Sequence, residues 1–160
     1  MQKISPFLWF NNEAEEAALF YTSIFKNSKI TKTTRYTGAG AKASGQQEGS
    51  VMTVAFELDG QNFTAINGGP IFKFTEAISF VINCKSQEEI DHYWNKLSEG
   101  GDPRAQQCGW LKDKYGLSWQ VVPEAIGELM SNPSTAQNVM SEILKMKKID
   151  IKVLETASGK

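Results

Sequence analysis

The stretch EEAALFYTSI, residues 15–24, has a counterpart in EEIDHYWNKL, residues 88–97, with a Glu pair, an aromatic pair and a closing aliphatic residue at the same offsets. In both stretches apolar residues recur at three- and four-residue spacing, which predicts an amphipathic helix with one apolar stripe. An interval of about seventy residues is too long for a solenoid repeat. The sequence therefore predicts two fused modules, each built around one such helix.

The segments around the first helix have the composition of strands in a small sheet. Asp59-Gly60 separates two alternating runs and predicts a hairpin, because both residues tolerate positive φ. The run GAGAKASGQQEGS, residues 38–50, has four glycines and no large apolar residue, so we expect a mobile loop. Asn12 with Glu15 predicts a capping box at the start of the helix. The expected elements are strands at residues 4–10, 29–36, 51–58 and 61–66 and a helix at residues 13–25.

The second module follows the same plan. Ser86 with Glu89 predicts another capping box, and Gly100-Gly101 ends the helix. The stretch QQCGWLKDKYGLSWQVVP, residues 106–123, holds two alternating runs around a Lys-Asp-Lys-Tyr-Gly turn and predicts a hairpin. The expected strands are residues 77–84, 108–111 and 117–122, and the expected C-terminal helices are residues 124–130, 135–146 and 150–157.

Charge and composition argue against several classes of protein. The 17 Lys and Arg residues against 18 Asp and Glu residues give a formal net charge of −1, unlike the basic footprint of a nucleic-acid binder or a membrane-surface protein. The N-terminal run MQKISPFLWF lacks the positive cluster and cleavage site of a signal peptide, and no membrane span is expected. We expect a cytoplasmic protein whose two cysteines, Cys84 and Cys108, stay reduced.

Five stretches resemble the PhnB-like group of the vicinal-oxygen-chelate superfamily, which includes glyoxalases, bleomycin-resistance proteins and extradiol dioxygenases. They are SPFLWFNNEAEEAALFY, LDGQNFTAINGGPIFKF, SFVINCKSQEEIDHYWNKLSEGG, QQCGWLKDKYGLSWQVVP and KMKKIDIKVLETA. Many members of this group carry the label 3-demethylubiquinone 3-methyltransferase. The resemblance implies an α+β fold of two βαβββ modules, each a curled sheet forming half of an open cup, which in many relatives is completed in a homodimer.

On this resemblance we expect a single domain over residues 1–160. Its expected parts are a first βαβββ module at residues 1–75, a second at residues 76–123 and a C-terminal helical tail at residues 124–160. The superfamily includes metal-dependent enzymes as well as metal-free drug-binding proteins. The function must therefore be argued from the site.

Metal-using relatives hold a divalent ion in the cup on His and Glu side chains. The resemblance places Ser5, Phe63, Ser79 and Gln120 at those positions, and none of the four is a good ligand. The single histidine, His92, is expected on the solvent side of the second helix. We therefore predict no catalytic metal and no cofactor, with a weak or substrate-completed divalent-metal site as the alternative.

Three further features have competing interpretations. GAGAKA, residues 38–43, matches G-x-G-x-x-A, but no apolar helix follows it, so a flexible loop is favoured over a cofactor site, with a lid over the cup as a weaker alternative. The segment NGGP, residues 67–70, offers backbone N–H groups to an anion or is simply a turn; the turn is favoured. Cys108 is either a nucleophile or a small buried hydrophobe at the start of a strand, and the second is favoured.

The candidate ligand site is an aromatic cup with a few neutral hydrogen-bonding groups. Ser5, Phe7 and Trp9 share one face of the first strand, and the resemblance turns that face into the cup. In the alternative, Trp9, Trp110 and Trp119 only fill the core. The candidate ligand-binding residues are Ser5, Phe7, Trp9, Phe63, Asn67, Ser79, Cys108, Trp110, Ser118 and Gln120, with Ala65 on the same wall.

Three functions are compatible with this pattern. The first is a homodimeric, metal-free protein that binds a small aromatic or hydrophobic molecule in the cup. The second is a lyase, isomerase or transferase that uses Asn67, Gln120 or Cys108 with a metal recruited by its substrate. The third is a structural module whose cup is filled by its own side chains. No nucleic acid or membrane partner is expected.

Overall fold

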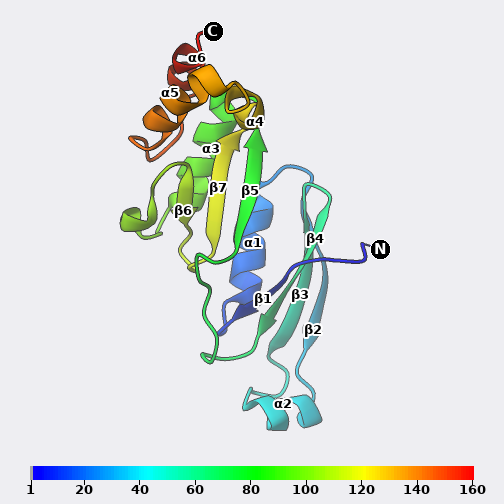
Figure 1. Ribbon diagram of the computed structural model, residues 1–160. Helices are drawn as coiled ribbons and strands as arrows, with labels where there is room; N and C mark the ends of the chain where they lie inside the picture. Colours follow the sequence, from blue (N-terminus) through cyan, green and yellow to red (C-terminus); the bar gives the residue numbers. More distant parts are fainter. Residues whose placement is uncertain (1) are drawn as a thin grey trace. The chain divides into compact units, whose positions relative to one another are not determined.

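The two repeated stretches form helix α1, Ala14–Ile24, and helix α3, Gln87–Ser98 (Figure 1). The structure, a computed structural model, describes residues 2–160 and divides into two compact units, Met1–Lys73 and Phe74–Lys160, with one of these helices in each. Both helices bury the predicted apolar stripe. The buried residues are Ala14, Ala17, Ala18, Tyr21 and Ile24 in α1 and Ile90, Trp94 and Leu97 in α3.

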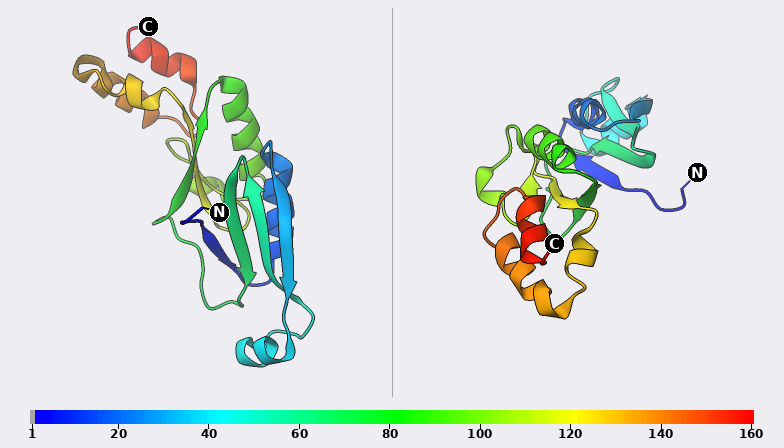
Figure 2. Two further views of the ribbon diagram at one scale, coloured as in Figure 1. Left: turned by 90° about the vertical axis from the view of Figure 1, so that its right-hand side faces the viewer. Right: turned by 90° about the horizontal axis from the view of Figure 1, so that it is seen from above.

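The first unit is a four-stranded sheet with α1 along one face (Figure 2). Its strand order is β1-β4-β3-β2, with β1 parallel to β4 and the other neighbours antiparallel. The predicted hairpin at Asp59-Gly60 is confirmed, because it joins β3 to β4 with φ of 46° and 84° at its two central residues. The strands are β1 Phe7–Phe10, β2 Lys29–Arg35, β3 Val51–Leu58 and β4 Gln61–Asn67.

The core of the first unit lies between this sheet and α1. The ring of Phe56 on β3 stacks on Tyr21 of α1 and on Phe63 of β4, with centroid distances of 6.2 and 5.4 Å. Leu8 and Phe10 of β1 point to the same side and are buried. Removing side chains of this size from water is worth about 1.5–3 kcal/mol each. This burial holds α1 against the sheet.

Two local predictions for the first unit are wrong. Residues expected in a mobile loop form a short helix, α2 Gly38–Ser44, which buries Ala41 and ends at Gly45 in the left-handed conformation. Asn12 does not cap α1. The N–H of Ala14 instead donates to Oδ1 of Asn67 at 2.8 Å, a residue that is brought in by β4 from 53 positions along the chain.

The second unit is a three-stranded sheet, β5 Ser79–Cys84, β7 Ser118–Pro123 and β6 Trp110–Lys112 in that order, with α3 on one face. The predicted cap is confirmed, because Ser86 Oγ accepts the N–H of Glu89 at 3.3 Å. Within residues 74–160 the expected fourth strand is missing. Its place between α3 and β6 is taken by the short 3-10 helix η1, Pro103–Ala105, because this segment has Pro103 and none of the β-branched residues that form β2.

The C-terminal helices belong to the second unit and are anchored to α3. The side chain of Gln87 donates to the carbonyl of Ile149 at 3.0 Å and accepts the N–H of Ile151 at 2.9 Å. Ile149 itself is buried. These helices are α4 Ile126–Leu129, α5 Pro133–Ile143 and α6 Ile151–Ala157. None of the helices within residues 2–160 has the length and hydropathy needed to cross a membrane.

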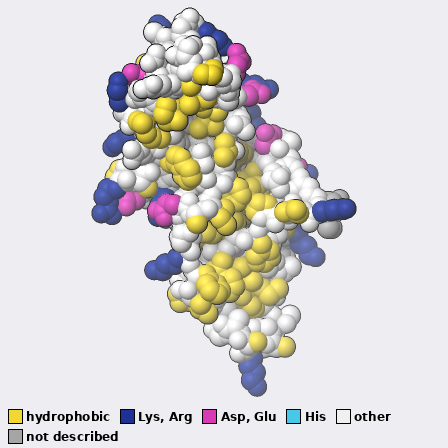
Figure 3. Space-filling view, in the orientation of Figure 1, with side chains coloured by type: hydrophobic (Ala, Val, Ile, Leu, Met, Phe, Trp, Pro, Cys, Tyr) yellow, Lys and Arg dark blue, Asp and Glu magenta, His cyan; other side chains and the backbone are white. Residues whose placement is uncertain are grey.

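Several large apolar side chains remain exposed, and Figure 3 shows hydrophobic atoms at the surface. In the first unit Ile4, Phe7, Ile71 and Phe72 expose 89, 61, 74 and 61% of their surface. Ile78 and Val81 of the second unit are also exposed. Exposed apolar side chains mark a surface that binds a ligand or another chain where they are contiguous.

Candidate functional site

The candidate site lies on the face of the second sheet that points away from α3. The strand register places Ser79 opposite Ser118 and Ser118 opposite Lys112. Two residues further along each strand, Val81, Gln120 and Trp110 form a second row. Directly paired residues point to the same side of a sheet. We call these residues the site face: Ser79, Val81, Trp110, Lys112, Ser118 and Gln120.

The polar groups of the site face are only partly satisfied. Nε2 of Gln120 donates to Oγ of Ser79 at 2.9 Å, which links β7 to β5. The Ser118 residue is only 1% exposed, yet its hydroxyl has no hydrogen-bond partner within residues 2–160. A buried hydroxyl without a partner costs free energy. The sequence analysis predicted that Ser79, Ser118 and Gln120 share a face, and the register confirms it.

The ammonium of Lys112 is held by Glu76, a residue that precedes β5. Their charged atoms are 2.5 Å apart. The hydrogen bond from Lys112 holds the pKa of the Glu76 carboxyl below its ordinary value. Because β5 and β6 lie on opposite sides of β7, this ion pair links the segment ahead of β5 to β6, past the end of β7 that carries Ser118.

The β6–β7 hairpin is held in shape by the buried carboxylate of Asp113. Its Oδ1 accepts the N–H groups of Tyr115 and Leu117 at 2.9 and 3.1 Å, and its Oδ2 accepts Nε1–H of Trp119 at 2.9 Å. Trp119 is buried on the side of α3, as the core-filling alternative expects. Asp113 was not among the residues predicted from the sequence. The signal was an Asp at the first position of a turn that ends in Gly116.

The expected wall of the cup in the first unit needs a correction. Phe7 pairs with Thr64 across the parallel β1–β4 register, so Phe63 and Asn67 point to the opposite side, toward α1. Phe63 and Asn67 are buried there, together with Ala65. Only Phe7 and Trp9 keep the expected face, and Ser5 is exposed ahead of β1.

Trp9 is anchored by the segment NGGP. Its Nε1–H donates to the carbonyl of Gly69 at 2.9 Å. The indole ring lies so close to Gly68 that a Cβ at this position would overlap it. The N–H groups of Gly68 and Gly69 donate to the carbonyls of residues 10 and 11. These N–H groups are therefore engaged, and the segment is a turn that positions Trp9 rather than a site for an anion.

Cys108 occupies a two-residue turn and not the start of a strand. Cys108 and Gly109 have φ of 54° and 83°, and the N–H of Cys108 donates to the carbonyl of Met146 at 2.9 Å. The turn thereby contacts the C-terminal segment. The other thiol, Cys84, is buried, and burial raises its pKa to about 12, so it stays protonated at neutral pH. His92 is exposed on α3, as predicted.

The residues expected at metal-ligand positions do not form a metal centre. Ser5 is exposed in the first unit, Phe63 faces α1, and Ser79 and Gln120 bond to each other. Within residues 2–160, no group of three or more His, Cys, Asp and Glu side chains is arranged to hold a metal ion. A hydroxyl and a neutral amide do not fit a divalent centre that needs several convergent N or O ligands.

The G-x-G-x-x-A match does not form a cofactor loop. Gly38 and Gly40 lie inside helix α2, whereas a phosphate-binding loop places its glycines ahead of the helix. The N–H of Ala41 donates to the carbonyl of Thr37 as part of that helix. The segment is therefore part of a short helix, rather than a cradle for a nucleotide-like group.

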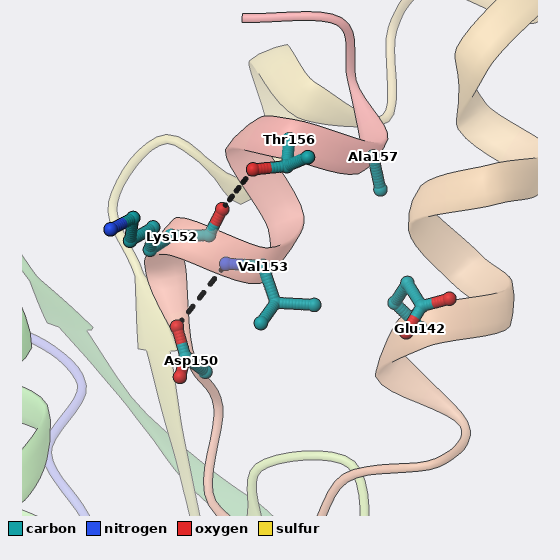
Figure 4. Close-up of a pocket in the computed structure, with 6 residues that line it drawn as sticks. All are labelled: Glu142, Asp150, Lys152, Val153, Thr156 and Ala157. Carbon is teal, nitrogen blue, oxygen red and sulfur yellow. Dashed lines mark hydrogen bonds between the residues drawn. The ribbon is translucent and has the colours of Figure 1, made fainter.

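A groove of about 370 Å³ lies between α5 and α6 (Figure 4). Two of its polar side chains bond within α6 and its cap: Oδ1 of Asp150 accepts the N–H of Val153, and Oγ1 of Thr156 donates to the carbonyl of Lys152. A third, Glu142 of α5, pairs with Lys145. The groove is lined by Glu142, Asp150, Lys152, Val153, Thr156 and Ala157. None of the predicted ligand-binding residues lines it. We interpret it as a seam between the terminal helices.

Comparisons with known proteins identify relatives of the part of the chain that carries the site face. A model of the family described as 3-demethylubiquinone-9 3-methyltransferase matches residues 2–122. A solved structure of a putative 3-demethylubiquinone-9 3-methyltransferase, the PhnB protein from Bacillus cereus, is 40% identical. The alignment covers 76% of this chain and 99% of that one, with a TM-score of 0.64.

Two more distant structures share the fold alone. Protein PA1353 from Pseudomonas aeruginosa is 20% identical over 77% of this chain and 98% of its own, with a TM-score of 0.58. The fosfomycin resistance protein FosX from Listeria monocytogenes, complexed with Mn(II) and sulfate, is 14% identical over 81% of this chain and 96% of its own, with a TM-score of 0.50. A search of curated proteins gave no match.

The family match ends at residue 122, so it includes the whole site face and leaves out α4, α5 and α6. The stretch KMKKIDIKVLETA, which the sequence analysis counted with the resemblance, lies beyond it. The relation to these proteins therefore concerns the two sheets and α1 and α3.

Proposed function

The chain belongs to the PhnB-like, 3-demethylubiquinone-9 3-methyltransferase family of the vicinal-oxygen-chelate superfamily, and from that premise we propose that it binds a small aromatic or hydrophobic molecule on its site face without a metal ion. The observation that supports this most is the row formed by Trp110, Gln120 and Val81. It combines an indole, a neutral amide and an exposed aliphatic side chain, which is the usual lining of a site for a flat organic molecule.

The amide of Gln120 is already oriented for such a ligand. Its Nε2 is committed to Ser79, so its Oε1 points elsewhere and makes no hydrogen bond within residues 2–160. The half-buried indole of Trp110 carries a donor, its Nε1–H, in the same row. The acceptor Oε1 of Gln120 and the donor N–H of Trp110 therefore lie beside the indole ring. They can hydrogen-bond to the polar group of a flat ligand that packs on this ring.

The family description names a methyltransferase, and the proposal concerns only the binding step that any transfer requires. For the second candidate, an enzyme that uses Asn67, Gln120 or Cys108, the geometry offers less support. Asn67 is committed to α1, and Cys108 to a turn. Of these three residues, only Gln120 lies on the site face, and its Nε2 bonds Ser79 there.

We also propose that the protein is a cytoplasmic homodimer. Support comes from the exposed apolar side chains of the first unit, which we call the apolar patch: Ile4, Phe7, Ile71 and Phe72. A second copy of the chain would remove this surface from water, which favours association.

Titration calorimetry with 2-naphthamide, a neutral flat amide, tests the binding proposal. We expect saturable binding to the native protein and a dissociation constant about tenfold higher for Gln120→Ala, because one hydrogen bond is lost. Gln137→Ala, an exposed change on α5, is the matched control and should bind as the native chain does. Absence of saturable binding to the native protein would reject the proposal.

Removal of divalent ions tests the metal-free part of the proposal. Dialysis against a chelator should leave the affinity for 2-naphthamide unchanged. Loss of binding after chelation, with recovery on adding Mn²⁺, would show that a metal completes the site.

A further inference from the structure

The first row of the site face has a different chemical character from the second. It consists of Lys112, Ser118 and Ser79 on three neighbouring strands. One ammonium and two hydroxyls therefore stand side by side, about 4.8 Å apart from strand to strand. All three groups can donate hydrogen bonds, which is the arrangement that an anionic oxygen requires.

Ser118 is the observation that points to a ligand in this row. Its hydroxyl is buried and has no hydrogen-bond partner within residues 2–160, although it lies between two polar neighbours. Ser79 on one side already receives the amide of Gln120. An incoming acceptor group would satisfy Ser118 and remove the cost of leaving its O–H unpaired.

The row already holds an anionic group supplied by the chain itself. The carboxylate of Glu76 contacts the ammonium of Lys112 at 2.5 Å, while the Glu76 side chain is 64% exposed. An exposed partner of this kind contributes little stability and is readily exchanged. Glu76 thus occupies the position that the anionic group of a ligand would take.

We propose that the site face selects organic anions, with a carboxylate or a comparable acidic oxygen bound by Lys112 and Ser118 in place of Glu76. The flat body of the ligand lies on the second row, against Trp110 and Gln120. The two rows are about 7 Å apart along the strands, which suits an acidic group attached directly to an aromatic ring system. This inference rests on the proposed function, because it names the ligand class of the same site.

The test compares two probes of the same shape, 2-naphthoate and 2-naphthamide, by titration calorimetry. We expect the anion to bind the native protein about tenfold more tightly than the amide, since charge-assisted hydrogen bonds are the stronger ones. Raising the salt concentration should weaken 2-naphthoate and leave 2-naphthamide unchanged.

Two variants test whether the preference for 2-naphthoate depends on the ion pair between Lys112 and Glu76. Lys112→Met should remove the advantage of 2-naphthoate, and Glu76→Gln should increase the affinity for 2-naphthoate several-fold, because the internal competitor is gone. The readout for both variants is the ratio of the two affinities, 2-naphthoate over 2-naphthamide, which Lys112→Met should bring to about one. Lys85→Met, which removes an exposed charge beyond the other end of β5, is the matched control and should keep the native preference.

The outcomes separate this inference from the proposed function. Equal affinities for the two probes, unchanged in Lys112→Met and Glu76→Gln, would overturn the anion preference and leave binding on the site face intact. Binding of neither probe would overturn both proposals. Glu76→Gln changes an exposed side chain, so it keeps the inference testable if Lys112→Met fails to fold.

Discussion

Asp113 and Ser118 are both buried polar residues of the β6–β7 hairpin, but they differ in their hydrogen bonding. Asp113 is 2% exposed, and both of its carboxylate oxygens accept hydrogen bonds from N–H groups of the hairpin. Ser118 is equally buried, but its hydroxyl has no partner within residues 2–160. A satisfied group of this kind stabilises a fold, whereas an unsatisfied one costs stability. Asp113 therefore has a structural role, whereas the unpaired hydroxyl of Ser118 supports the proposed ligand site.

Asp113→Asn should lower the free energy of unfolding by about 1–3 kcal/mol. An amide has one acceptor oxygen, so it cannot serve both the turn N–H groups and Nε1–H of Trp119, and its NH₂ group would face a donor. Chemical denaturation followed by circular dichroism measures the loss. Asp59→Asn is the control, because Asp59 is an exposed turn residue with φ of 46°, a conformation that Asn also tolerates. Equal stability of the two variants would contradict the role of Asp113.

At the scale of elements, Asn67 joins parts of the first unit that are distant in sequence. Its Oδ1 accepts the N–H of Ala14 at 2.8 Å, and its Nδ2 donates to the carbonyl of Val51 at 3.1 Å. The carbonyl of Asn67 accepts the hydroxyl of Tyr36 at 2.6 Å. The first turn of α1 is thus capped by the end of β4, rather than by a residue that precedes the helix.

Asn67→Ala should cost about 1–3 kcal/mol of stability, because it leaves the buried N–H of Ala14 and the carbonyl of Val51 without these partners. Asn12→Ala, the change at the cap that the local sequence predicts, should stay within about 0.5 kcal/mol of the native value. Denaturant unfolding of both variants decides between the two caps. A larger loss of unfolding free energy in Asn12→Ala than in Asn67→Ala would show that Asn12 caps α1 and would contradict this prediction.

At the scale of the whole molecule, exposed apolar surface is the observation behind the proposed dimer. In the apolar patch, Phe7 begins β1 and Ile4 precedes it, whereas Ile71 and Phe72 follow the end of β4. A monomer that keeps such side chains in water gives up the free energy that their burial provides. A symmetric dimer contains the patch twice, so a substitution in it changes the free energy of dimerisation at two equivalent positions.

If the proposed dimer forms through the apolar patch, Ile71→Lys should raise its dissociation constant about a hundredfold, since two exposed isoleucines at roughly 1.5 kcal/mol each no longer contribute. Sedimentation equilibrium over a range of concentrations measures this constant. Leu19→Lys is the control, because it removes an exposed apolar side chain from α1 outside the apolar patch. A native protein that sediments as a monomer at micromolar concentration would exclude the dimer.

The sequence by itself determined what depends on near neighbours along the chain. The stripes of α1 and α3, the Asp59-Gly60 hairpin and the Ser86 cap all follow from spacings of two to four residues. The shared face of Ser79, Ser118 and Gln120 was also predicted. Local spacing was sufficient for the helices, the hairpin and the cap because the partners of each residue lie within one or two turns of it. The shared face, by contrast, was predicted from the resemblance to the family.

The tertiary structure alone decided what depends on strand register and on distant partners. The parallel register of β1 on β4 turned Phe63 and Asn67 toward α1, because a shift of one residue exchanges the two faces of a strand. The cap of α1 crosses 53 residues, and the pairing of Glu76 with Lys112 links the segment ahead of β5 to β6, on the other side of β7. Such contacts are set by packing between elements, and spacing along the chain does not contain them.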